Sequence, residues 1–164
     1  MTDLPTYVLE RTFDAPRALV WRAWTDPELL ARWYGPGVET IIHKLKVAAG
    51  GEWLCEMRWG ENQNYQRVDY TEVVEPEKLV WLQSVTDENW APVDNPMMPN
   101  WPQVLLTTVT FADAGDKTHM RLTWVPHDAS QQEIDAFDQA LANLDRGWAA
   151  GMDIIAEILA ELQA

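Results

Sequence analysis

Residues 130–164 read SQQEIDAFDQALANLDRGWAAGMDIIAEILAELQA, and this stretch decides the fold. Its apolar residues recur at steps of three and four, which is the spacing of one face of an α-helix. They are Ile134, Phe137, Leu141, Leu144, Trp148, Met152, Ile155, Leu159 and Leu162. Ser130 and Glu133 have the spacing of a capping box, so we predict one long helix that begins at this serine. A stripe of this length needs a large apolar partner.

The chain before this helix consists mostly of alternating patterns typical of β-strands. We predict strands over residues 7–13, 40–47, 52–59, 65–74, 79–85, 104–111 and 118–125. Two short helices follow the first strand, because Pro16 and Pro27 each suit the first turn of a helix. Residues 86–103 form a polar, proline-rich insert, of the kind that serves as a lid, a binding loop or a disordered flap. The pattern predicts an α+β fold in which a curved, mostly antiparallel sheet wraps around the C-terminal helix.

Composition narrows the possible classes of protein. A chain of 164 residues with 47% hydrophobic residues is predicted to be one globular domain over 1–164. No apolar run is long enough to cross a bilayer, and the start MTDLPTYV lacks the pattern of a signal peptide, so a cytoplasmic location is expected. The lone Cys55 excludes an internal disulfide and fits a reducing compartment. A net charge of −14 argues against nucleic acid and anionic membranes as partners.

Several short motifs resemble the AHSA-like family, which belongs to the SRPBCC or START-like superfamily. They occur in the family's order along nearly the whole chain: 13–16 (FDAP), 20–21 (VW), 24–27 (WTDP), 33–36 (WYGP), 50–51 (GG), 74–80 (VEPEKLV), 108–111 (TVTF) and 147–148 (GW). The resemblance implies a helix-grip fold with a cavity between the sheet and the C-terminal helix. Where the family often has an acidic residue and an arginine before the paired glycines, this chain has Lys46 and Ala48. A role of that arginine is therefore not carried over.

Ten tryptophans are an unusual number, and we expect them to line a cavity, to fill the core, or both. The apolar faces of the predicted strands and of the terminal helix supply the candidate ligand-binding residues. These are Trp53, Cys55, Met57, Trp59, Trp81, Val109, Phe111, Met120, Trp124, Leu144, Trp148 and Met152. Aromatic rings together with adaptable methionines suit a flat, apolar ligand. The alternative is that these side chains simply fill the core.

Polar residues on apolar faces are further candidates. Arg11 shares its strand face with Leu9 and Phe13, and it could anchor a ligand carboxylate or phenolate or form an ion pair. Arg67 and Asp69 raise the same choice on the fourth strand. Other charged residues, Glu56 and Arg58, lie opposite the predicted cavity face, where we expect them to be solvated or paired with neighbouring strands.

Signals for catalysis, metals and cofactors are weak. The three histidines, His43, His119 and His127, lack a second histidine or a carboxylate at metal-ligand spacing. Cys55 has no base or electropositive neighbour nearby in the sequence, so we interpret it as a buried, inert thiol. No nucleophile elbow, phosphate loop or dinucleotide fingerprint is present, and no cofactor is predicted.

Three functions of different classes remain open. The first is the binding of a small hydrophobic or aromatic molecule between the sheet and the C-terminal helix. The second is a cyclase- or hydrolase-like enzyme that uses the same cavity. The third, which the resemblance implies, is a chaperone-partner module that stimulates a heat-shock protein ATPase and so takes part in a stress response. The chain is expected to act as a monomer or a homodimer.

Overall fold

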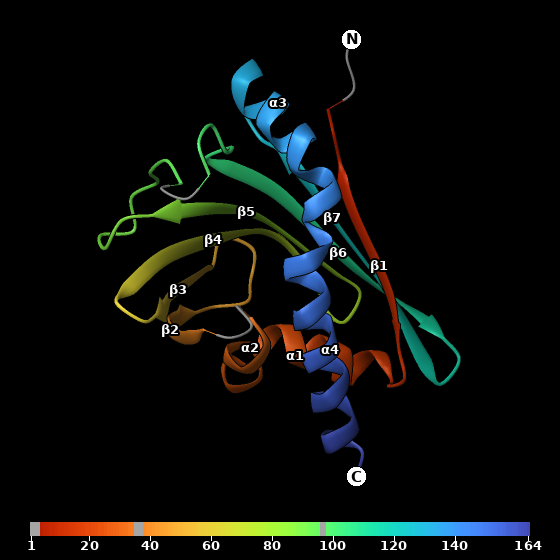
Figure 1. The fold of residues 1–164 in the computed structure, drawn as a ribbon. Helices are drawn as coiled ribbons and strands as arrows, with labels where there is room; N and C mark the ends of the chain where they lie inside the picture. Colours follow the sequence, from red (N-terminus) through yellow and green to blue (C-terminus); the bar gives the residue numbers. More distant parts are fainter. Residues whose placement is uncertain (1–3, 35–37, 96–97) are drawn as a thin grey trace.

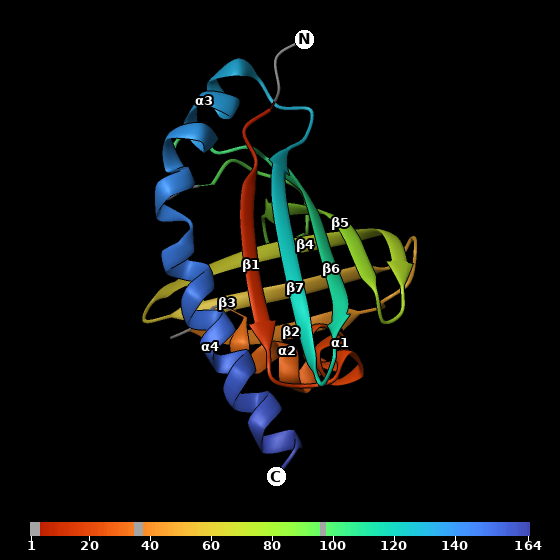
Figure 2. The same ribbon diagram turned by 90° about the vertical axis from the view of Figure 1, so that its right-hand side faces the viewer.

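The computed structural model describes residues 4–34, 38–95 and 98–164. Its strands form one antiparallel sheet in the order β1-β7-β6-β5-β4-β3-β2. Their bounds are β1 (Tyr7–Phe13), β2 (Glu39–Leu45), β3 (Glu52–Trp59), β4 (Asn62–Val74), β5 (Lys78–Thr86), β6 (Val104–Ala114) and β7 (Lys117–Pro126). The sheet is strongly curved, so that β1, β7 and β6 run across the direction of β3 and β4 (Figure 2).

Helices cover one face and one end of this sheet (Figure 1). They are α1 (Arg17–Thr25), α2 (Pro27–Trp33), α3 (Gln131–Ala140) and α4 (Asp145–Leu162), with the short 3₁₀ helix η1 (Leu141–Asn143) between the last two. Asp26 accepts a hydrogen bond from the Glu28 backbone nitrogen and caps α2, with Pro27 as its first residue. The predicted helix-grip architecture, including the two short helices after the first strand, is confirmed.

The core lies between the curved sheet, α1, α2 and α4, and it is rich in tryptophan. Trp24, Trp33, Trp53 and Trp81 are almost fully buried. Trp24 meets the Trp33 ring edge-on, with 4.5 Å between the ring centroids. From α4, Met152 and Ile155 contribute fully buried side chains to the same core. Much of the aromatic content is therefore structural filling.

The terminal helix is not continuous, which corrects the prediction of one long helix. Its capping box is present, because Ser130 and Glu133 each accept from the other's backbone nitrogen. The helix then tightens over 141–143, where the Leu144 backbone nitrogen donates to the Leu141 carbonyl three residues before it. Leu141 and Leu144 are half-buried at the edge of the core, and Asn143 and Leu144 line a cavity beside it. The tighter turn therefore lies where the terminal helix borders this cavity.

The described part of the 86–103 insert packs against the molecule. Thr86 and Pro92 form an isolated bridge, and Trp101 is buried against Phe137 of α3 at a centroid distance of 5.4 Å. Gln103 is tied to the start of the same helix, because its backbone nitrogen donates to Glu133. The insert thus forms one side of the opening between the sheet and α3.

Candidate ligand-binding site

A cavity of about 510 Å³ lies between the sheet, the insert and the break in the terminal helix. Every strand from β3 to β7 contributes to its wall, together with the end of α2 and the α3–α4 junction. The lining residues are Trp33, Tyr34, Met57, Gln66, Gln83, Ser84, Val85, Asn95, Met98, Trp101, Pro102, Gln103, Leu105, Trp124, Ala140, Asn143, Leu144, Trp148 and Gly151. Its size is that of an ordinary small-molecule site.

The cavity has a buried end and an exposed end. Tyr34, Met57 and Gln83 are buried, with at most 8% of each residue exposed, whereas Gln103 and Asn143 are exposed. The opening therefore lies between the insert and the break in the terminal helix. An aromatic wall flanks the cavity, where Trp124 and Trp148 meet nearly perpendicularly with 5.1 Å between their centroids. Such rings present flat apolar surface to a ligand.

A hydrogen-bonded polar cluster lies in this lining. The Tyr34 hydroxyl donates to Gln66 Oε1 at 2.6 Å, and Gln83 Nε2 donates to the same hydroxyl at 2.9 Å and to Gln66 Oε1 at 3.0 Å. Behind the cluster, Trp81 Nε1 donates to Gln83 Oε1 at 3.2 Å. Burial raises the pKa of Tyr34, so the phenol keeps its proton and remains a donor.

Four of the residues predicted to bind a ligand line this cavity: Met57, Trp124, Leu144 and Trp148. The others lie outside its lining. Those packed in the core are Trp53, Cys55, Trp81, Val109, Phe111, Met120 and Met152, with Trp59 half-buried at the core's edge. They fill space behind the cavity wall because the curvature brings other aromatic rings against them. Trp53, for example, lies 4.7 Å from Tyr34, centroid to centroid.

Arg11 also lies outside the cavity lining. Its Nη2 donates to Asp153 of α4 at 2.6 Å, and its side chain is 33% exposed. The carboxylate that pairs with it thus comes from the chain itself.

The sequence reasoning missed the polar cluster and most of the insert's contribution. In the sequence, Tyr34 is only part of a family motif, and Gln66 lies in a largely polar part of its strand. Gln83 did carry a signal, because it is a polar residue that shares its strand face with Trp81 and Val85. The insert carried a signal, because its length suggested a lid or binding loop, and it supplies Met98, Trp101 and Gln103 to the lining.

Cys55 is buried beside Tyr34 and Tyr70, and burial raises the pKa of its thiol to about 12. A thiol with that pKa stays protonated near neutral pH and is a poor nucleophile. Within 4–34, 38–95 and 98–164, no three His, Cys, Asp or Glu side chains lie together as a metal site would require.

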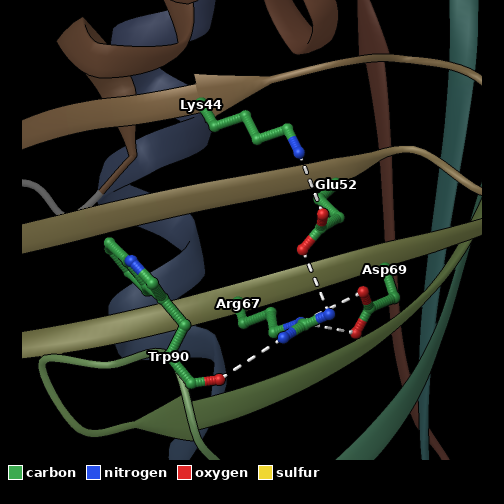
Figure 3. A network of polar contacts seen from close by, with 5 residues as sticks. All are labelled: Lys44, Glu52, Arg67, Asp69 and Trp90. Carbon is green, nitrogen blue, oxygen red and sulfur yellow. Dashed lines mark hydrogen bonds and ion pairs between the residues drawn. The ribbon is translucent and has the colours of Figure 1, made fainter.

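The outer face of the sheet holds the charged residues of β3 and β4 in a network (Figure 3). Arg67 contacts Asp69 at 3.1 Å and Glu52 at 3.0 Å, and its Nη1 donates to the Trp90 carbonyl at 3.4 Å. Lys44 of β2 joins the network through Glu52, with 3.0 Å between its Nζ and Glu52 Oε1. Arg67 is therefore held by carboxylates of its own chain on the face opposite the cavity.

These features define a class of protein: a helix-grip domain with a largely apolar cavity between its sheet and its C-terminal helix. A family model described as "Activator of Hsp90 ATPase homolog 1-like protein" matches residues 14–160, so the chain belongs to this family. The resemblance inferred from the motifs is thereby confirmed, although Gly35 and Pro36 of one motif lie outside the described residues.

Solved structures share the fold at low sequence identity. A protein from Arthrobacter aurescens, solved by NMR, has a TM-score of 0.80 and 22% identity, and the match covers 95% of this chain and 86% of that one. A crystal structure from Mycobacterium smegmatis has a TM-score of 0.77 and 21% identity, with 96% of each chain covered. A protein from Staphylococcus epidermidis has a TM-score of 0.76 and 19% identity, covering 98% of this chain and 93% of its own.

A search of curated proteins gives no match to this chain. None of the helices in the described part of the chain has the length and apolar character needed to span a membrane.

Proposed function

We propose that this protein binds a small hydrophobic or aromatic molecule in the cavity between the curved sheet and the C-terminal helix. The observation that carries the proposal is the cavity itself, about 510 Å³ with indole walls and a polar cluster at its buried end. A packed core of this aromatic content would leave no such space. A mostly apolar pocket with a few convergent polar groups is the usual form of a small-molecule site.

Binding fits the lining better than catalysis does. Acid–base chemistry needs a group that gains or loses a proton near the working pH. Among the described lining residues, Tyr34 is the one titratable side chain, and its raised pKa keeps it protonated. The lining thus offers positioning and hydrogen bonds but no evident proton acceptor for a cyclase- or hydrolase-like reaction.

Native mass spectrometry of freshly purified protein is the first experiment, because a carried-over small molecule would identify the ligand class directly. The chaperone-partner function, which the family description suggests, makes a different prediction. A surface-acting module would bind a large chaperone with unchanged affinity after the cavity is filled.

Met57→Trp is the variant that tests the cavity. Met57 is buried and lines the cavity, so a larger indole there occupies ligand space. We expect the variant to stay folded and to lose both ligand-induced quenching of tryptophan fluorescence and the ligand-induced rise in melting temperature. For the parent, mass action gives about 2.7 kcal/mol of stabilisation at a hundredfold excess of ligand over its dissociation constant.

Leu54→Trp is the matched control, because Leu54 lies on the same strand but on the opposite face of the sheet and is half-exposed. It adds the same indole without entering the cavity, so ligand effects should match those of the parent. Loss of ligand binding in both variants, or in neither, would argue against this cavity as the binding site.

A further inference from the structure

The cavity lining is polar in places but uncharged. Its described residues include tyrosine, glutamine, asparagine and serine side chains, and none of them carries a formal charge. The two internal segments outside the described ranges, 35–37 and 96–97, consist of glycine, proline and methionine, so neither contains a charged side chain. A charged ligand group inside the cavity would therefore lose its hydration without meeting a counter-charge, which is strongly unfavourable.

Carboxylates lie at the opening. Gln103 lines the exposed end of the cavity, and its Nε2 donates to Asp94 Oδ1 at 2.9 Å. Its backbone nitrogen donates to Glu133 Oε2, also at 2.9 Å. Hydrogen bonds from Ser130 and Gln103 lower the pKa of Glu133, so this carboxylate is ionised near neutral pH. Together with the net charge of −14, these groups repel an anion before it enters.

The direction of the hydrogen bonds shows which donor groups of the polar cluster remain available to a ligand. The Trp81 indole can only donate, so the Gln83 atom facing it must be the amide oxygen. Gln83 then turns its amide nitrogen towards Tyr34 and Gln66, and both of its protons are used there. These donors, together with the Tyr34 hydroxyl, require the oxygen of Gln66 on their side.

Gln66 Nε2 therefore keeps its hydrogen-bonding capacity, because it donates to no group in the described part of the chain. A second donor is in a similar position: the Trp124 indole nitrogen is buried without a partner among the described residues, and its ring lines the cavity. Gln66 Nε2 and the Trp124 indole nitrogen can only donate, so a ligand must bring acceptors to satisfy them. The buried Ser84 hydroxyl, which also lines the cavity, can donate or accept and does not oppose such a ligand.

We infer that the cavity selects an uncharged ligand that presents an acceptor oxygen, such as a ketone, ester or ether, to the Gln66 amide. This inference rests on the proposed function and sets its ligand class. It separates neutral carbonyl compounds from the aromatic carboxylic acids that apolar walls alone would equally accommodate.

Two pairs of probes test charge and acceptor separately, read by intrinsic fluorescence and melting temperature. The pair para-benzoylbenzamide and para-benzoylbenzoate differs in charge at nearly constant shape. We expect the carboxylate to bind at least about tenfold more weakly, because its desolvation is uncompensated. The pair benzophenone and diphenylmethane differs in the carbonyl oxygen, and we expect benzophenone to bind about threefold to tenfold more tightly.

Gln66→Met removes the amide at similar volume and should erase the preference for benzophenone over diphenylmethane. Gln63→Met on the same strand is the control, because Gln63 is exposed and lies outside the lining. Should Gln66→Met disturb the cluster and the fold, Leu144→Lys provides a second test. A cation in the lining should raise the affinity for para-benzoylbenzoate about tenfold, whereas Ala142→Lys, exposed and outside the lining, should not.

If para-benzoylbenzoate binds the parent as tightly as the amide, the inference about charge is wrong while the proposed function stands. If benzophenone and diphenylmethane bind equally, the inference about the acceptor is wrong. If no probe binds and native mass spectrometry finds no carried molecule, the proposed function fails and this inference falls with it.

Discussion

Glu56 shows how a single residue on the outer face becomes part of the structure. Alternation along β3 placed it opposite the cavity face, and its partners are indeed on neighbouring positions of the sheet. His43 of β2 contacts one carboxylate oxygen at 2.9 Å, and Arg58 contacts the other. These groups cover the carboxylate, so Glu56 is only 3% exposed. The hydrogen bond from Arg58, followed by that from His43, lowers the pKa of Glu56.

A lowered pKa in the folded state means that the charged carboxylate stabilises the fold. This contribution is present above the ordinary pKa of a glutamate, about 4.3, and is lost as pH falls through the folded value. We therefore expect Glu56→Gln to lower the melting temperature at neutral pH. The difference from the parent should shrink as the pH is lowered into the acid range, which thermal melts across that range would measure.

Glu61→Gln is the matched control, because Glu61 is an exposed residue in the turn between β3 and β4. Its melting temperature should follow that of the parent at every pH. A Glu56→Gln variant whose deficit stays constant down to acid pH would show that the carboxylate's charge is not what stabilises this face.

For single residues, the sequence predicts the face of the sheet on which a side chain lies. It predicts less well which other residues that side chain contacts. Trp53, Cys55 and Met57 do share the inner face of β3, as alternation indicated. Only Met57 reaches the cavity, because Trp53 packs against Tyr34 and Cys55 is covered by the same layer. Such contacts depend on curvature and on residues distant in sequence, and neither leaves a local pattern.

Among the elements, α3 has a start that its sequence specifies closely. The capping box joins Ser130 and Glu133, and Glu133 also holds the Gln103 backbone at the cavity opening. The break that follows carries no proline or glycine, so nothing local announces it. It lies beside the cavity, whose lining includes Asn143 and Leu144, and that position is a tertiary feature.

Ser130→Ala tests the capping box. The substitution leaves the Glu133 backbone nitrogen without its side-chain acceptor, which costs about 0.5–2 kcal/mol of stability at an N-cap. Chemical denaturation should report a lower free energy of unfolding. Gln132→Ala, at an exposed position of the first turn, is expected to change it by no more than about 0.5 kcal/mol. Equal effects of the two substitutions would contradict a capping role for Ser130.

At the scale of the whole molecule, the fold is built by packing the curved sheet and the two short helices around α4. The sequence predicted this packing, because the long apolar stripe of the terminal helix needs an apolar surface to cover it and most of the remaining chain has strand patterns. The cavity was expected only in outline, since its walls combine the insert, five strands and the helix break. No periodicity within one element could specify that combination.

Removing residues 148–164 is the strongest test of the architecture. The segment carries Trp148, Met152, Ile155, Ile158 and Leu159, all of them buried. Burying a large apolar side chain contributes about 1.5–3 kcal/mol, whereas a whole domain is stable by only about 5–15 kcal/mol. The truncated chain should therefore be unfolded or aggregated by circular dichroism and light scattering. A chain that lacks only residues 163–164 loses hydrogen bonds from Gln163 to Asp14 and Leu159 but no buried apolar side chain, so it should still fold. Cooperative unfolding of the longer truncation would show that the sheet forms its own core, and α4 could not then be the element around which it is built.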